Sequence, residues 1–194
     1  MILPIIAYGD PILRKVGKEI DEEYTNLEEL IENMTETMHS AKGVGLAAPQ
    51  IGKAIRLFII DASPFEENDE LEEDERLFLK DFKGVFINPK IINEGGGEWA
   101  FNEGCLSIPN INEDVFREEQ IEIEYLDENF KIHKKTLDGL AARIFQHEYD
   151  HIDGVLFTDK LSTLKKRLLK KKLANISKGN IDVAYRMKFP LSKK

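Results

Sequence analysis

The sequence predicts an α+β fold in which antiparallel sheets pack around a central helix, with a second helix nearer the N-terminus and a third nearer the C-terminus. Apolar side chains recur every three or four positions over residues 26–41 and 137–152, which is the period of a helix that buries one face. Residues 115–126 instead alternate apolar and charged side chains, and after a polar turn a second strand is expected over residues 130–135. These two strands predict an antiparallel hairpin.

The composition favours one globular domain over residues 1–194, because 42% of the residues are hydrophobic. The net charge of −9 argues against binding to free nucleic acid, since a phosphate backbone would be repelled. The N-terminus lacks the pattern of a signal peptide, and no apolar run is long enough to cross a membrane. Cys105 is the only cysteine, which excludes an intrachain disulfide. We therefore expect a cytoplasmic protein without a membrane segment.

The N-terminal part of the chain is expected to lead into the first helix and the first buried strand. Residues 1–24 are short apolar runs broken by a Gly-Asp-Pro turn, and they predict an extended arm laid on the domain. The helix over residues 26–41 ends at Gly43, and the apolar run at residues 54–60 predicts a buried strand.

The middle of the chain contains an acidic stretch and an interrupted strand. Residues 66–75 hold eight acidic residues in ten positions. Because this density of like charge repels itself, we expect a solvated, mobile excursion. Asn88-Pro89 interrupts the apolar run over residues 85–92, which predicts an edge strand because proline cannot donate to a sheet ladder. Asn93 to Gly97 predicts a turn.

The C-terminal third is expected to contain two helices and a terminal strand. Thr136 is the predicted N-cap of the helix over residues 137–152. A further helix is predicted over residues 161–173 and a short strand over residues 181–189. The helix at 161–173 carries six basic side chains: Lys165, Lys166, Arg167, Lys170, Lys171 and Lys172. A solvated basic face is slightly favoured over a docking surface for this cluster.

The central helix carries the pattern His-Glu-x-x-His at residues 147–151. Residues four apart lie on one helix face, so His147 and His151 can present two imidazoles to one metal ion. Glu148 lies beside that ion, where a carboxylate can exchange protons with water. With the His and Glu content of this chain, roughly 0.01 such matches are expected by chance. Residues 137–152 are therefore predicted to form a metal-binding helix.

The third protein ligand is not obvious from the helix alone. Two large protease classes take it from downstream of this pattern, but the histidine of one class is replaced by Phe157, and no glutamate follows Glu148. The ligand is therefore expected upstream, and the candidates are His39, His133, Cys105 or a carboxylate. Cys105 is favoured, because it lies in a glycine-containing, non-helical segment and a thiolate binds such ions tightly.

Three segments together resemble the signature motifs of the peptide deformylase family: residues 43–50 (Gly-Val-Gly-Leu-Ala-Ala-Pro-Gln), 103–107 (Glu-Gly-Cys-Leu-Ser) and 146–151 (Gln-His-Glu-Tyr-Asp-His). The resemblance implies a metal held by Cys105, His147 and His151. It implies Fe(II) as the native ion, with zinc, nickel or cobalt as substitutes. The substrate it implies is the N-formylmethionyl end of a nascent polypeptide, and the basic helix is a candidate contact with the ribosome.

The resemblance also implies roles for individual residues. Glu148 is the expected base and then acid. The Gln50 amide and the Leu106 backbone N–H are expected to donate to the developing oxyanion. Gly45 lets the backbone approach the substrate, and Ile144 is an expected wall of the methionine pocket. Two positions depart from better-known members: Arg143 stands where an aliphatic residue is common, and Asn112 where an arginine often holds the peptide. Glu103 is expected to pair with Arg117.

Two rival interpretations stay open at this point. A metallopeptidase using the same two histidines would need a downstream ligand and would be indifferent to Cys105→Ser. A structural metal site in an interaction module would need four protein ligands and would give Glu148 no role.

Overall fold

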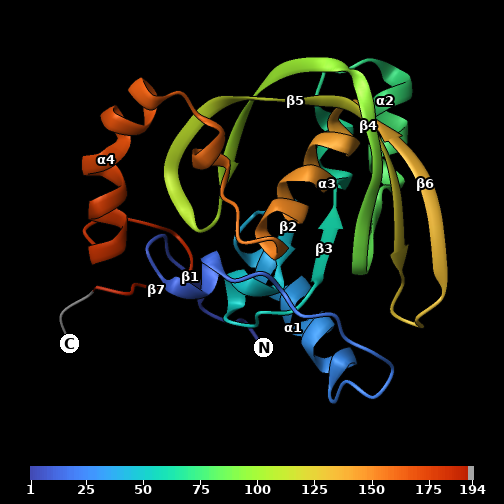
Figure 1. The fold of residues 1–194 in the computed structure, drawn as a ribbon, viewed down its shortest axis with the longest axis horizontal. Coiled ribbons are helices and arrows are strands. Elements are labelled where there is room, and N and C mark those ends of the chain that lie inside the picture. The colour runs from blue at the N-terminus through green and yellow to red at the C-terminus, as the bar shows by residue number, and fades with distance from the viewer. Residues whose placement is uncertain (192–194) are drawn as a thin grey trace.

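A computed structural model describes residues 1–191 and has an α+β architecture (Figure 1). The helices are α1 (Leu27–Ser40), α2 (Glu73–Asp81), α3 (Gly139–Ile152) and α4 (Thr163–Lys178). The strands are β1 (Ile5–Ile6), β2 (Gly45–Ala47), β3 (Leu57–Asp61), β4 (Lys83–Cys105), β5 (Ile108–Leu126), β6 (Ile132–Asp138) and β7 (Met187–Lys188). Within the described residues, no helix has both the length and the apolar character required to span a membrane.

The main sheet has the order β2-β3-β4-β5-β6, and every neighbouring pair is antiparallel. The predicted hairpin is present as β5 and β6, whose Ile123 and Lys135 face each other. The long strands β4 and β5 arch over α3, so that the sheet encloses this helix (Figure 1). A second sheet pairs the short strands β1 and β7 in parallel, near the two chain ends.

Residues 85–92 form an interrupted strand, as predicted, but the predictions of an edge position and of a turn at residues 93–97 are wrong. Both segments belong to β4, an inner strand between β3 and β5. The strand tolerates Pro89 because the register shifts between Ile87 and Lys90, where Asn88 has a φ of +46°. Asn88 also exchanges two side-chain hydrogen bonds with the backbone of Ile20, at 3.0 and 2.8 Å. A bulge with partners outside the sheet therefore accommodates the proline, which an edge position was expected to do.

The acidic segment 66–75 is folded, contrary to the prediction of a mobile excursion. Its second half opens α2, whose first turn is acidic, as the helix dipole favours. Glu66 forms an ion pair with Lys80 at 2.5 Å. Glu75 accepts a hydrogen bond of 2.9 Å from the backbone N–H of Leu140, in the first turn of α3. The acidic segment therefore helps to cap the central helix.

The predicted N-cap at Thr136 is also wrong. Thr136 belongs to β6, and α3 begins at Gly139 after Asp138, whose side chain makes no capping hydrogen bond. The bond from Leu140 to Glu75 takes the place of a local cap. The last helix starts two residues later than predicted and ends five residues later, with Ser162 as its N-cap.

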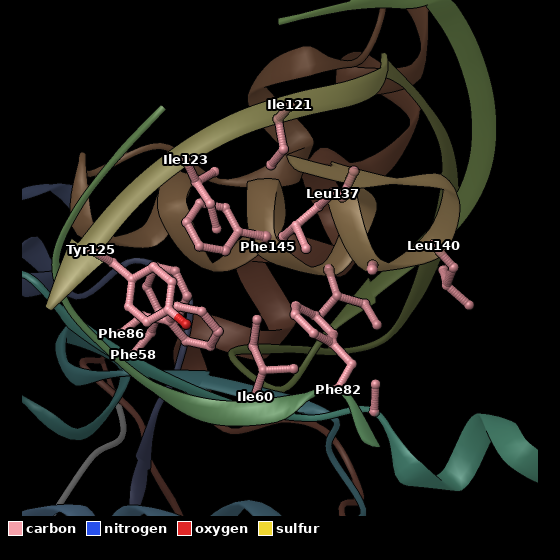
Figure 2. Packing of buried hydrophobic residues seen from close by; sticks show 14 of the residues in the cluster. Phe58, Ile60, Phe82, Phe86, Ile121, Ile123, Tyr125, Leu137, Leu140 and Phe145 are labelled. Atoms are coloured by element: carbon pink, nitrogen blue, oxygen red, sulfur yellow. The ribbon is translucent and has the colours of Figure 1, made fainter. Parts of the chain in front are cut away.

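Aromatic packing fixes the position of α3 against the sheet. Phe145 on α3 is fully buried and contacts the rings of Phe58 and Phe86 at centroid distances of 5.1 and 5.3 Å (Figure 2). Both contacts are edge-to-face, which is a favoured geometry for such pairs. The opposite side of the same helix, which carries His147 and His151, thereby faces Cys105 at the end of β4.

Candidate active site

Helix α3 and the end of β4 bring the three predicted metal ligands together. His147 and His151 lie one helical turn apart, with ring centroids 5.0 Å from each other. Cys105 is the last residue of β4, and its Sγ lies 3.3 Å from His151 Nε2. One ligand atom from each of the three residues lies within 4.8 Å of the other two. A thiolate and two imidazoles in this arrangement fit a three-ligand metal site with an open position.

The hydrogen bonds around the three residues support this fit. His147 Nδ1 lies 2.9 Å from Glu103 Oε2, which leaves Nε2 free to face a metal. Burial lowers the pKa of His147, but its contacts with Cys105 and Glu103 outweigh this effect and raise that pKa well above its usual value. Because a metal binds a thiolate and neutral imidazoles, a cation that enters this site displaces protons from these groups. The donor set is therefore one that a cation would complete.

The other two histidines lie elsewhere. His39 pairs with Asp61 at 2.9 Å, and His133 pairs with Asp127 at 2.7 Å. Asp159, a downstream carboxylate, pairs with Arg14 instead of facing the site. None of these residues takes part in the group formed by Cys105 and the two α3 histidines. The downstream ligand that a metallopeptidase would require is not in this group.

Glu148 lies in the same site but has no strong partner. Its side chain is buried, and its Oε2 has no hydrogen-bond partner within the described residues. Burial raises the pKa of Glu148 to about 7. A carboxylate in this state can take up and release a proton near neutral pH.

Gly45 on β2 leaves the space that Glu148 fills. A Cβ atom on residue 45 would stand 2.7 Å from Glu148 Cδ, closer than side chains pack. A glycine is therefore required here by the position of the carboxylate, in addition to the close approach of a substrate that the sequence suggested.

Gln50 connects the first motif to the cysteine segment. Its Oε1 accepts a 2.8 Å hydrogen bond from the Ala47 N–H, which fixes the orientation of the amide. Its Nε2 then donates to Ser107 Oγ at 3.2 Å and faces Cys105 Sγ at 3.5 Å. The amide N–H groups of Gln50 thus point at the predicted site, as a donor to an oxyanion would need.

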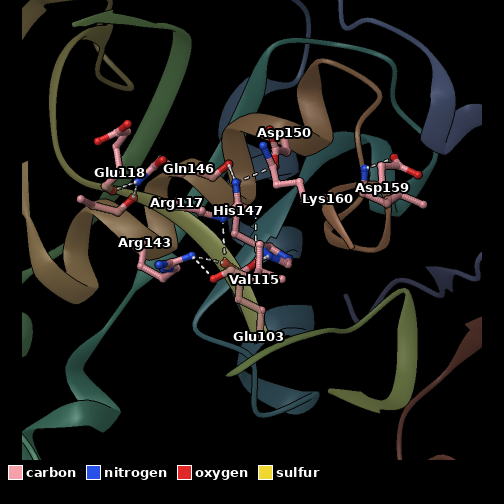
Figure 3. A network of polar contacts seen from close by, with 12 residues as sticks. Glu103, Val115, Arg117, Glu118, Arg143, Gln146, His147, Asp150, Asp159 and Lys160 are labelled. Carbon is pink, nitrogen blue, oxygen red and sulfur yellow. Dashed lines mark hydrogen bonds and ion pairs between the residues drawn. The ribbon is translucent and has the colours of Figure 1, made fainter. Parts of the chain in front are cut away.

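A network of charged side chains supports the site from behind (Figure 3). Glu103 receives two hydrogen bonds from Arg117, at 2.7 and 3.0 Å, so the predicted pair is present. Arg143 donates a third hydrogen bond at 2.9 Å, and Arg117 also reaches Asp150 at 2.6 Å. Burial raises the pKa of Glu103, but His147 and Arg117 outweigh it and hold that pKa well below its usual range. Glu103 therefore stays charged while it orients His147.

Sequence reasoning missed the structural role of Arg143. Its guanidinium stacks on the Trp99 ring at 4.5 Å and donates to the carbonyls of Val115 and Trp99 at 3.0 and 2.6 Å. A usable signal was present, because Arg143 lies one helical turn before His147 and so shares its face. The arginine is buried, and it braces Glu103 from the helix side.

The site opens into a cleft of about 640 Å³. All three motifs line it, together with Ile144 from α3 and the exposed Asn112 from β5. Residues 182–185, which follow α4, line it too. The burial of Ile144 fits the expected apolar wall.

Comparisons with known proteins agree with the geometry. Residues 2–167 match the family model described as polypeptide deformylase. A peptide deformylase of Christiangramia forsetii is 64% identical over 100% of this chain and 99% of its own, and one of Flavobacterium johnsoniae is 59% identical over the same shares. The crystal structure of a peptide deformylase from Legionella pneumophila matches with a TM-score of 0.77 and 38% identity, covering 93% of this chain and 98% of its own. The chain belongs to the polypeptide deformylase family.

Proposed function

We propose specific residue roles for the reaction of this family, the hydrolytic removal of the N-formyl group from N-formylmethionine of nascent polypeptides with release of formate. The observation that carries the assignment is the position of Glu148. This buried, unpaired carboxylate shares one cleft with the group formed by Cys105, His147 and His151. A base beside a three-ligand metal site is the arrangement that metal-assisted hydrolysis requires.

Cys105, His147 and His151 would hold the metal, and we propose Fe(II) as the native ion, with zinc, nickel or cobalt as substitutes. When bound, the ion supplies a Lewis acid and lowers the pKa of water at the site. The thiolate of Cys105 and the two imidazoles suit ions of this group better than they suit magnesium or calcium.

Glu148 would take the proton of the attacking water and then pass it to the amine that leaves. Its raised pKa suits both steps, because the group can hold or release a proton near neutral pH. Gln50 Nε2 and the Leu106 backbone N–H would donate to the oxygen of the former formyl carbonyl as negative charge builds on it. Loss of one such donor typically costs about 10²–10³ in rate. Gly45 would leave room for the peptide backbone of the substrate beside Glu148.

The apolar side of the cleft would hold the methionine side chain of the substrate, with Ile144 as one wall. We also propose that residues 1–194 act as a single catalytic domain in the cytoplasm, although residues 192–194 lie outside the described part of the chain. The basic α4 would contact the ribosome through side chains such as Lys166 and Arg167, which are exposed. Lys165 of this cluster already pairs with Glu113 at 2.8 Å.

The test is formate release from a formyl-methionyl tripeptide, using protein purified without oxygen and loaded with Fe(II). We expect turnover by the wild type, and loss of both bound iron and turnover in Cys105→Ser. Activity should also fall on exposure to air, because a thiolate–Fe(II) site is open to oxidation. Cys105→Ser protein that keeps its metal and its activity would refute the ligand assignment, and activity unchanged by long aeration would refute Fe(II).

A further inference from the structure

The turn that carries Leu106 has a geometry that needs outside support. Leu106 and Ser107 form a two-residue connection between β4 and β5, because Cys105 and Ile108 face each other across the hairpin. Two-residue hairpins favour mirror-image turns, which need a positive φ, since these match the twist of the strands. Neither Leu106 nor Ser107 has a positive φ. The backbone of this turn is therefore not fixed by the hairpin alone.

Three distant segments hold this turn by hydrogen bonds. The backbone N–H of Tyr8, in the N-terminal arm, donates to the Ser107 carbonyl at 2.9 Å. Gln50 Nε2 donates to Ser107 Oγ at 3.2 Å. The Tyr185 hydroxyl donates to the Leu106 carbonyl at 2.8 Å. Of the three contacts, the one from Tyr185 is made to Leu106, the residue that we propose as an oxyanion donor.

Tyr185 belongs to the segment that returns to the cleft after α4. The helix ends at Gly179 with a φ of +74°, and the chain then runs back until β7 pairs with β1 (Figure 1). The Asp182 carbonyl accepts a hydrogen bond of 3.1 Å from Asn110 Nδ2, which ties the segment to the start of β5. This segment lies beyond residue 167, where the match to the family model ends.

We propose that Tyr185 is a positioning residue for deformylation, because its hydroxyl holds the Leu106 carbonyl and so anchors the turn that carries the Leu106 N–H. The middle peptide of this turn joins the Leu106 carbonyl to the Ser107 N–H, and its orientation differs between turn types. A hydrogen bond to its carbonyl selects one orientation and restrains the Leu106 backbone from that side. Burial, with the charge of Cys105 nearby, raises the pKa of Tyr185, which keeps the hydroxyl protonated and able to donate. The inference rests on the proposed role of Leu106 as an oxyanion donor.

Tyr185→Phe tests the contact, because it keeps the ring in the cleft wall and removes only the hydroxyl. Tyr125→Phe is the matched control, since Tyr125 is buried in the sheet core beside Phe86 and His133 and does not line the cleft. We expect kcat for a formyl-methionyl tripeptide to fall about fivefold in Tyr185→Phe with KM unchanged, in keeping with one neutral hydrogen bond. Hydrogen–deuterium exchange over residues 104–108 should become faster in the same variant, measured without added metal. Tyr125→Phe should change neither quantity.

The two readouts separate the possible failures. Unchanged exchange together with unchanged kcat would show that the Tyr185 hydroxyl does not hold the turn, and would overturn the inference. Faster exchange with unchanged kcat would overturn it through the proposed role of Leu106, because the turn would then be loosened without consequence for the reaction. A rise in KM alone would also overturn it, since Tyr185 would then be only a wall for the substrate.

Discussion

Glu103 and Glu148 are two buried carboxylates of the same site, and a comparison of the two explains how this site is built. Each is 5% exposed, so burial alone cannot distinguish them. Glu103 receives hydrogen bonds from Arg117, Arg143 and His147, and its pKa is held well below the usual range although burial opposes this. Glu148 has an oxygen without a partner, and burial raises its pKa to about 7.

The difference shows that partners decide the use of a buried carboxylate. A carboxylate surrounded by cations remains ionised and can only hold its neighbours in place. A carboxylate with an unpaired oxygen is costly for the fold, but it is free to exchange a proton during a reaction. Both line the cleft, but the stable member holds His147 in place and the costly member is free to exchange a proton.

The largest effect is expected from Glu148→Gln. The variant keeps the shape of the side chain but cannot accept the proton, so kcat should fall by about 10²–10⁴-fold. Metal binding should remain, and the unfolding free energy at pH 8 should be at least that of the wild type, because an unpaired buried charge has been removed. Formate release, metal content and urea unfolding measure these three quantities. A variant that loses activity only by unfolding or by losing its metal would contradict the role of base.

Glu103→Gln, in contrast, should destabilise the fold and weaken metal binding. It leaves Arg117 and Arg143 buried without their shared anion, so we expect a loss of about 3–5 kcal/mol in unfolding free energy at pH 7. Metal affinity should fall by about 10–100-fold, because His147 loses its charged hydrogen-bond partner. Since the folded-state pKa of Glu103 is lowered, the stability difference from the wild type should shrink as the pH falls below 4.5, the ordinary value. A variant as stable as the wild type would refute the structural role of Glu103 in this comparison.

The pH dependence of activity sharpens the comparison further. In metal-free protein Glu148 should titrate near its raised pKa of about 7, which isotope-labelled NMR can follow. A cation held by the three ligands would favour the ionised form, so the acid limb of kcat/KM should lie at a pH below 7. Activity should fall tenfold per pH unit below that limb when excess metal is present. An acid limb that persists at the same pH in Glu148→Gln would assign it to another group.

The sequence was sufficient to predict that Cys105, His147 and His151 come together, and to predict the central helix and the hairpin beside it. The helix and the hairpin could be predicted because they depend on local signals. The helical spacing of His147 and His151 and the alternation of residues 115–126 are both readable within a short window. The prediction failed where distant segments decide the structure. Pro89 lies in an inner strand because Ile20 provides hydrogen-bond partners for Asn88 at the bulge. The start of α3 is stabilised by Glu75, which accepts a hydrogen bond from the Leu140 N–H.

The same limit applies to the site. The Glu103–Arg117 pair was predicted, but Arg143 and Asp150 were not placed around it, although both lie in or next to the third motif. The contribution of Tyr185 could not be predicted, since 79 residues separate it from Leu106 and no pattern marks it. Contacts of this kind follow only from the path of the whole chain.

The smallest effect is expected from Asp150→Asn, which tests how far the supporting network extends. Asp150 is half-buried and pairs with Arg117 at 2.6 Å and with the partly exposed Lys160 at 3.4 Å. Arg117 keeps both of its bonds to Glu103 in this variant, so we expect a loss of about 1 kcal/mol in unfolding free energy and kcat within a factor of about two of the wild type. Urea unfolding and formate release, measured beside Glu103→Gln, provide the comparison. A loss as large as that of Glu103→Gln would show that Arg117 depends on both carboxylates, and that the supporting region is one cooperative network instead of a set of partners centred on Glu103.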